Sequence, residues 1–214
     1  MGLLLAGLSV LIIGDSHLAT PNYLISTLHD DLSRRGAVVH TLGICGTNAG
    51  DWLKVTPGTC GGAERIGAGK VTLLGSKAAT RPVAQLIEQE KPGLVVVVMG
   101  DTMAAYDKPN FPKTWAWQQV TGLTGAIAAT GTRCVWVGPA WGSEGGKYGK
   151  TYARAELMSA FLAANAAPCS YVDSLKLSTK GQWATIDGQH LTTTGYQQWG
   201  AAIGKAISTL PAAK

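Results

Sequence analysis

Residues 94–99 constrain the fold more than any other segment, because the centre of this run is four consecutive valines. A run that is apolar at every position is typical of a strand buried on both faces, and such strands belong to parallel sheets. Parallel neighbours must be joined by crossover connections, which are usually helices. The segment therefore predicts an α/β protein with helices on both faces of a parallel sheet.

The rest of the chain alternates between short apolar runs and longer segments with helical spacing. Leu24, Leu28 and Leu32 recur every four residues, and Gly36 follows them as a stop signal. We expect strands at residues 8–13, 37–42, 94–99, 134–137 and 170–172, and helices at residues 21–35, 79–90, 113–130, 152–166 and 193–210. Five strands with intervening helices predict a three-layer α/β fold, which we assign to residues 1–214 as a single domain.

Two glycine-rich segments, 50–77 and 141–150, interrupt this alternation. We expect both to be long loops, which in a compact domain are usually functional or mobile. The second follows an expected strand, and open α/β sheets bind ligands at the carboxyl ends of their strands. Trp141 and Tyr148 are therefore candidates for stacking on a substrate ring, with packing as the alternative. Trp115 and Trp117 begin an expected helix and are assigned to packing.

The composition describes a folded protein with a modest excess of positive charge. Hydrophobic residues make up 46% and charged residues 14%, proportions that exclude a disordered chain. The net charge is +5, but Lys and Arg are scattered, which argues against a nucleic-acid partner. No apolar run is long enough to cross a bilayer, so stable membrane insertion is not expected. We interpret residues 1–7 as the stub of a removed export signal or an artificial start.

The four cysteines are Cys45, Cys60, Cys134 and Cys169. None belongs to a CxxC pair, which argues against a structural zinc site. An even number at wide spacing favours two disulfides in an oxidising compartment, with the pairing Cys45–Cys60 and Cys134–Cys169. Four buried free thiols in a cytosolic protein remain the alternative.

The first candidate for chemistry is the sequence Gly14-Asp15-Ser16-His17, which follows the first expected strand. A serine there lies at the carboxyl edge of the sheet, near the start of the next helix. Backbone N–H groups at that point can face a developing oxyanion. Taken alone, such a serine can equally be a helix cap.

The second candidate is the sequence Asp187-Gly188-Gln189-His190, which precedes the last expected helix. An aspartate three residues before a histidine can orient the imidazole through Nδ1 and leave Nε2 to take a proton from a serine. Each segment alone is ordinary, but the two together point to a serine nucleophile with its base.

These two segments resemble the first and last sequence blocks of the SGNH/GDSL hydrolases, and Gly43-Ile44-Cys45-Gly46 resembles the second block. The resemblance spans nearly the whole chain and implies the family's flavodoxin-like fold. It also implies that Ser16 is the nucleophile, His190 the general base and Asp187 its orienting acid. The amides of Ser16 and Gly46 would donate to the oxyanion, and the chemistry would need no metal or organic cofactor.

One block departs from the family pattern. The family usually carries Gly-x-Asn after its central strand, and the Asn side chain donates to the oxyanion; here the sequence is Gly100-Asp101-Thr102. Losing one such donor can cost about 100- to 1,000-fold in rate. Either Thr102 substitutes through its shorter hydroxyl, or Asn48 supplies the donor, or hydrolysis is slow. The candidate substrate-binding residues near these motifs are Asp15, His17, Asn48 and Asp101.

The resemblance implies a serine ester hydrolase, and an exported, basic member of this family suggests O-acetyl groups on a polysaccharide as the substrate. We expect a periplasmic or secreted location. A polysaccharide O-acetyltransferase that uses the same triad is the first alternative. A non-catalytic glycan-binding or assembly subunit is the second, and the departure at Thr102 motivates it.

Overall fold

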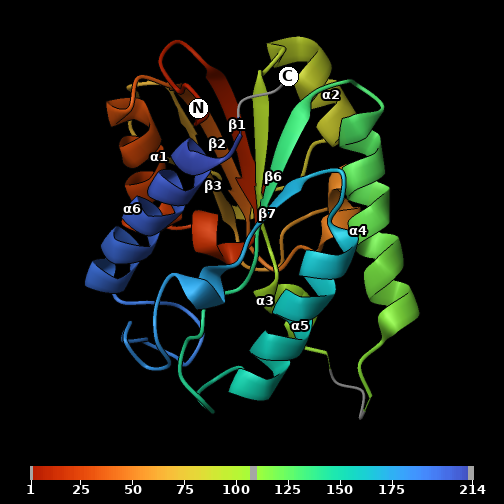
Figure 1. Cartoon of the computed structure of the whole chain (residues 1–214), viewed down its shortest axis with the longest axis vertical. Coiled ribbons are helices and arrows are strands. Elements are labelled where there is room, and N and C mark those ends of the chain that lie inside the picture. Colours follow the sequence, from red (N-terminus) through yellow and green to blue (C-terminus); the bar gives the residue numbers. More distant parts are fainter. Residues whose placement is uncertain (1, 107–109, 212–214) are drawn as a thin grey trace.

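A seven-stranded sheet forms the centre of the protein in the computed structural model, which describes residues 2–106 and 110–211 (Figure 1). The order of the strands is β4-β3-β2-β1-β5-β6-β7. Their bounds are β1 Ser9–Gly14, β2 Val38–Ile44, β3 Gly62–Ile66, β4 Thr72–Leu73, β5 Leu94–Val98, β6 Arg133–Val137 and β7 Ser170–Val172. The five expected strands pair in parallel, which confirms the α/β fold class.

Helices cover both faces of the sheet and complete the three layers (Figure 1). On one face lie α1 (Leu24–Arg34) and α6 (Thr193–Thr209), which contact each other. On the other face lie α2 (Val83–Glu90), α4 (Lys113–Ala128) and α5 (Tyr152–Asn165). The short helix α3 (Asp101–Ala104) directly follows β5. Four 3-10 turns complete the elements: η1 Ser16–Leu18, η2 Ala49–Leu53, η3 Gly75–Lys77 and η4 Ser174–Lys176.

The valine run of β5 divides between two hydrophobic cores, one on each face of the sheet. Val95 and Val97 belong to the core under α2, α4 and α5. Leu94, Val96 and Val98 belong to the core under α1 and α6. All five side chains are at most 1% exposed. Because successive strand residues point to opposite faces, only a strand covered on both sides can bury every one of them.

Residues 50–77 differ from the expectation of a long loop. They hold η2, the strands β3 and β4, and η3. β3 pairs antiparallel with β2, and β4 pairs antiparallel with β3, so the sheet is mixed and has two strands more than expected. The sequence pattern missed these strands because they form a short, partly exposed sheet edge, with little apolar alternation to signal them.

The first described residues, 2–7, pack against the rest of the fold. Leu3 and Leu5 are buried in the core under α1 and α6. Gly2 forms a β-bridge with Pro211 near the end of α6. Met1 lies outside the described residues.

Both disulfides have the expected pairing, Cys45 with Cys60 and Cys134 with Cys169. The second joins the start of β6 to the residue before β7. Two disulfides are consistent with an extracytoplasmic location. Within the described ranges, no helix combines the length and apolar character that a membrane span requires.

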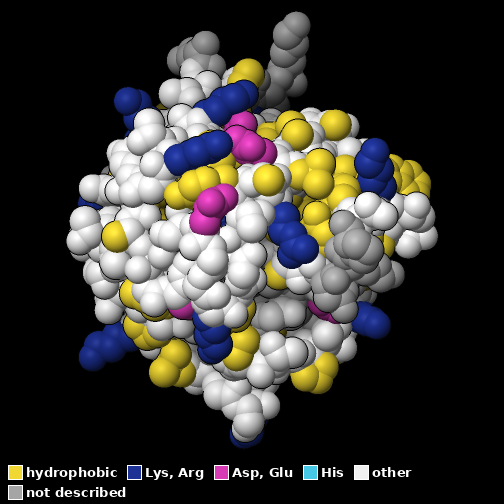
Figure 2. Space-filling view, turned by 90° about the horizontal axis from the view of Figure 1, so that it is seen from below, with side chains coloured by type: hydrophobic (Ala, Val, Ile, Leu, Met, Phe, Trp, Pro, Cys, Tyr) yellow, Lys and Arg dark blue, Asp and Glu magenta, His cyan; other side chains and the backbone are white. Residues whose placement is uncertain are grey.

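The parallel strands present their carboxyl ends at one end of the molecule, where α3 lies in Figure 1. Ser16 follows β1 and Gly46 follows β2, while Asp101 and Thr102 follow β5. Figure 2 views this end from below, with Lys and Arg scattered among uncharged side chains rather than gathered in a band. The motifs selected from the sequence therefore meet on one rim of the sheet.

Candidate active site

The candidate nucleophile lies in a tight turn at the end of the central strand β1. The carboxylate of Asp15 accepts a hydrogen bond from the backbone N–H of His17 at 3.1 Å and thereby caps η1. The backbone at Gly14 approaches β5 so closely that a Cβ atom there would lie 2.2 Å from the carbonyl oxygen of Val98. These constraints fix the Ser16 side chain at the sheet edge, where 7% of the residue is exposed.

Ser16, His190 and Asp187 form one chain of hydrogen bonds. Ser16 Oγ lies 2.7 Å from His190 Nε2, and His190 Nδ1 lies 2.7 Å from Asp187 Oδ2. An ionised Asp187 can only accept a hydrogen bond, so Nδ1 carries the proton and Nε2 is free to accept the proton of the serine. This is the arrangement that activates a serine hydroxyl for attack on a carbonyl carbon.

Asp187 also holds the backbone of its own loop. Its Oδ1 accepts hydrogen bonds from the backbone N–H of His190 at 2.7 Å and of Gln189 at 3.0 Å. Burial alone would raise the pKa of Asp187, but the hydrogen bonds from the ring and backbone of His190 lower that pKa below its ordinary value. The three-residue spacing therefore lets one carboxylate bind both the backbone and the ring of the histidine.

Burial lowers the pKa of His190 below its ordinary value of 6.5, and the neighbouring His17 acts in the same direction, against the carboxylate of Asp187. A general base must be neutral to accept a proton. We expect kcat/KM for a simple ester to rise as pH increases through the acidic range, with a midpoint below 6.5. The measurement is a pH–rate profile, with an NMR titration of the His190 ring in Ser16→Ala as the matched observation. A midpoint at or above the ordinary histidine value would contradict this expectation.

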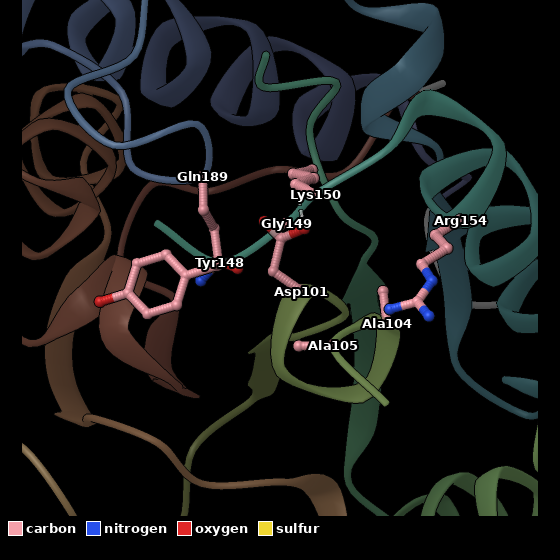
Figure 3. Close-up of a pocket in the computed structure, with 8 residues that line it drawn as sticks. All are labelled: Asp101, Ala104, Ala105, Tyr148, Gly149, Lys150, Arg154 and Gln189. Atoms are coloured by element: carbon pink, nitrogen blue, oxygen red, sulfur yellow. Dashed lines mark hydrogen bonds and ion pairs between the residues drawn. The ribbon is translucent and has the colours of Figure 1, made fainter. Parts of the chain in front are cut away.

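A second buried network of hydrogen bonds lies next to the triad. His17 Nδ1 lies 2.8 Å from the hydroxyl of Tyr196, and His17 Nε2 lies 2.7 Å from Asp101 Oδ2. Lys150 Nζ donates to Asp101 Oδ1 at 2.6 Å and to the carbonyl of Ala140 at 2.7 Å. Figure 3 shows Lys150 over Asp101. The centroids of the His17 and His190 rings are 5.3 Å apart, so the two networks are in contact.

This network determines what His17 and Asp101 can do. Burial would raise the pKa of Asp101, but Lys150 and His17 lower that pKa to about 2, so the carboxylate is ionised at neutral pH. Asp101 and His17 are each 2% exposed, and their polar side-chain atoms bond to protein partners. Both residues, expected as candidates for substrate binding, therefore lie beneath the site. Nothing in the sequence marked Lys150 as the partner of Asp101.

The candidate oxyanion donors other than Ser16 lie in the segments that follow β2 and β5. Gly46 follows β2 with φ of +82°, and a Cβ atom there would lie 2.0 Å from the hydroxyl of Thr59, so only glycine fits. The hydroxyl of Thr102 donates to Asp15 Oδ2 over 3.4 Å. Burial raises the pKa of Asp15, the carboxyl group that accepts this hydrogen bond. Thr102 and the third candidate donor, Asn48, both line one cavity.

The two aromatic candidates in the 141–150 segment have different surroundings. Tyr148 is 41% exposed, and its ring lies 5.5 Å from that of His190, at the rim of the triad. Trp141 instead donates its indole N–H to the carbonyls of Leu175 and Ser178 and packs edge-on against Tyr152. The structure thus brings Tyr148 to the site and gives Trp141 a packing role.

The 141–150 segment also supports the loop that carries Asp187. The backbone N–H of Lys147 donates to the carbonyl of Asp187 at 2.9 Å, and that of Ser143 donates to the carbonyl of Gly188 at 2.8 Å. On the other side of the triad, the sequence interpretation missed Tyr23, whose ring stacks 5.8 Å from His190 and 4.1 Å from Tyr196. In the described part of the chain, no group of three or more His, Cys, Asp or Glu side chains is arranged to hold a metal ion.

Comparison with known proteins identifies the family. No protein-family model matches the chain. Protein BcsX of Komagataeibacter xylinus is 46% identical over 213 residues, which cover 99% of this chain and 80% of that protein. The chain belongs to the BcsX family.

This chain, a relative of BcsX, is similar in fold to solved structures of SGNH/GDSL hydrolases. A protein from Slackia heliotrinireducens described as an SGNH hydrolase superposes with a TM-score of 0.63 at 20% identity, over 94% of this chain and 99% of that one. An acetyl xylan esterase superposes with a TM-score of 0.58 at 12% identity, over 93% and 99%. A peptidoglycan O-acetylesterase gives 0.57 at 11% identity, over 95% and 91%. The BcsX-family chain therefore has the SGNH hydrolase fold over nearly its full length.

Proposed function

We propose that this protein is a serine ester hydrolase that removes O-acetyl groups from a polysaccharide through an acyl-serine intermediate. One observation carries the proposal: the chain of 2.7 Å contacts from Ser16 Oγ through the His190 ring to Asp187. Two solved structures with this fold are an acetyl xylan esterase and a peptidoglycan O-acetylesterase, which favours a carbohydrate ester. The two disulfides favour a periplasmic or secreted location.

The reaction follows from the geometry of these three residues. Ser16 Oγ attacks the carbonyl carbon of the acetyl ester while His190 Nε2 takes the hydroxyl proton. The backbone N–H groups of Ser16 and Gly46 donate to the oxyanion. The tetrahedral intermediate expels the sugar oxygen, which receives the proton from His190, and the acetyl group remains on Ser16. Water then attacks the acyl carbon while His190 Nε2 takes one of its protons. That proton passes to Ser16 Oγ as the bond between Oγ and the acyl carbon breaks, and the acetic acid that leaves ionises to acetate in solution. Throughout, Asp187 stays ionised and holds the imidazole in place.

A side chain completes the oxyanion site, and the structure favours Asn48 over Thr102. The hydroxyl of Thr102 donates to the carboxylate of Asp15, whereas Asn48 lines the adjoining cavity and its amide group carries two N–H donors. We expect Asn48→Ala to lower kcat by about 100-fold with a small change in KM, and Thr102→Val to lower it by less than about tenfold. Steady-state kinetics on p-nitrophenyl acetate measure both. If Thr102→Val has the larger effect, the hydroxyl is the donor.

The proposed function is tested by acetate release from acetylated xylo-oligosaccharides, compared with the Ser16→Ala variant. A fluorophosphonate probe should label Ser16, with the modified residue located by mass spectrometry. Wild-type protein that releases no acetate and does not react with the probe would overturn the proposal.

Acetyl transfer to a sugar is a second candidate function, because the triad residues Ser16 and His190 are largely shielded from solvent. Ser16 and His190 are each only 7% exposed, and the rings of Tyr23 and Tyr148 lie beside His190. Limited access of water to an acyl-serine favours a sugar hydroxyl as the acceptor. Transfer that exceeds hydrolysis when unacetylated xylo-oligosaccharide is supplied would establish this alternative.

A further inference from the structure

A cavity of about 490 Å³ adjoins the nucleophile turn, and the proposed reaction uses only Asn48 of the residues that line it. It lies between the residues after β2, the α3 helix and the start of α4, and its walls include Asn48, Thr102, Tyr106, Pro112 and Trp115. Thr102 connects it to the active site, because its hydroxyl bonds to Asp15, the neighbour of Ser16. The volume falls within the usual range of small-molecule sites.

The aromatic walls of this cavity are held in place. Trp115 is partly buried and packs against the core under α2, α4 and α5. The guanidinium of Arg154 lies 4.3 Å from the centre of the Tyr106 ring. Phe111 contacts the same ring edge-on at 5.7 Å. Both rings are therefore positioned before any ligand arrives, which lowers the entropic cost of binding.

The chemistry of the walls selects the kind of ligand. Among the described residues that line the cavity, none carries a charge. Flat aromatic rings match the apolar C–H faces of a pyranose, and the hydroxyl oxygen of Thr102, whose proton is donated to Asp15, can accept a hydrogen bond from a sugar hydroxyl. A neutral, polyhydroxylated ring fits this combination better than an acyl chain, which would need no polar partners.

We propose that this cavity binds a neutral sugar ring of the polysaccharide, against Trp115 and Tyr106, and so holds the acetylated unit at Ser16. The inference rests on the proposed function, because it assigns the place where the proposed polysaccharide substrate is bound. It also separates two tryptophans that the sequence alone assigns to packing. Trp115 faces the cavity, whereas Trp117 on the same helix is 52% exposed and is not among the cavity-lining residues.

These two tryptophans supply a matched pair of variants. We expect Trp115→Ala to raise KM for acetylated xylo-oligosaccharides by about three- to tenfold while KM and kcat for p-nitrophenyl acetate change less than about twofold. Trp117→Ala should leave both substrates unaffected. Trp115→Leu, which keeps apolar packing against the core but lacks the ring face, should reproduce the rise in KM if the alanine variant folds poorly.

Binding measured without catalysis keeps this inference separate from the proposed function. Unacetylated xylo-oligosaccharide should bind the Ser16→Ala protein in isothermal titration calorimetry and bind several-fold more weakly after Trp115→Ala. If wild type hydrolyses no ester, the proposed function fails while this measurement still tests the cavity. Equal affinity and equal KM in the Trp115 and Trp117 variants would overturn the inference. So would a Trp115→Ala defect confined to p-nitrophenyl octanoate, which would make the cavity an acyl-chain site.

Discussion

Ser16→Ala is expected to lower kcat for p-nitrophenyl acetate by roughly five orders of magnitude, because the variant lacks the atom that forms the acyl intermediate. The Ser16 hydroxyl is the only group that His190 Nε2 contacts within hydrogen-bond distance among the described residues. Steady-state rates of wild type and variant, with thermal melts to show that the fold is intact, measure the effect. Retention of more than about a tenth of the activity would show that another residue performs the chemistry.

The same residues should act as a unit rather than independently. His190→Ala alone should reduce kcat about as much as Ser16→Ala, and the double variant should be no worse than either, because neither group works without the other. Asp187→Ala should cost less, since it leaves the nucleophile and base in place. A double variant whose loss equals the product of the single losses would contradict a shared mechanism.

Lys150→Met is expected to destabilise the protein by about 3–5 kcal/mol, because it leaves the carboxylate of Asp101 buried without its cation. In a chain of this size that loss corresponds to a fall in Tm of roughly 10 °C. Lys147→Met is the matched control, since Lys147 is exposed in the same segment and should change Tm little. The double variant Asp101→Asn/Lys150→Met should recover part of the loss because no unpaired charge remains.

The effect of pH on this ion pair has a definite sign. The pKa of Asp101 is about 2 in the folded protein, below its ordinary value of 3.8. Its contribution to stability is therefore complete above about pH 4 and disappears as pH falls towards 2. The difference in stability between wild type and Lys150→Met, measured by chemical denaturation, should shrink over that interval. A difference that is constant with pH would show that the pair contributes through packing alone.

The parts of this molecule that were predictable from the sequence are those with local signals. Four consecutive valines require a strand covered on both faces, and residues 94–98 form that strand. The three-residue spacing from Asp187 to His190 predicted a carboxylate that orients the ring through Nδ1, and the structure adds a hydrogen bond to the backbone of His190. The wide spacing of the cysteines likewise favoured the observed pairing.

The parts that were not predictable depend on contacts between distant segments. Lys150 ends a glycine-rich segment and looks like a solvated charge, but its partner Asp101 lies 49 positions away. Trp115 and Trp117 have equivalent sequence surroundings, and only the docking of α4 on the sheet places them differently. The strand β3 is stabilised by pairing with β2 rather than by an apolar pattern of its own.

The backbone hydrogen bonds that join residues 141–150 to Asp187 and Gly188 restrict where the length of this chain can change. Because Lys150 anchors one end of that segment to Asp101 while Lys147 supports Asp187, an insertion or deletion between them would displace the acid partner of His190. Length changes that leave the triad in place would therefore have to occur elsewhere, for example around the start of α4, which contributes no residue to the triad or to the Asp101–Lys150 pair.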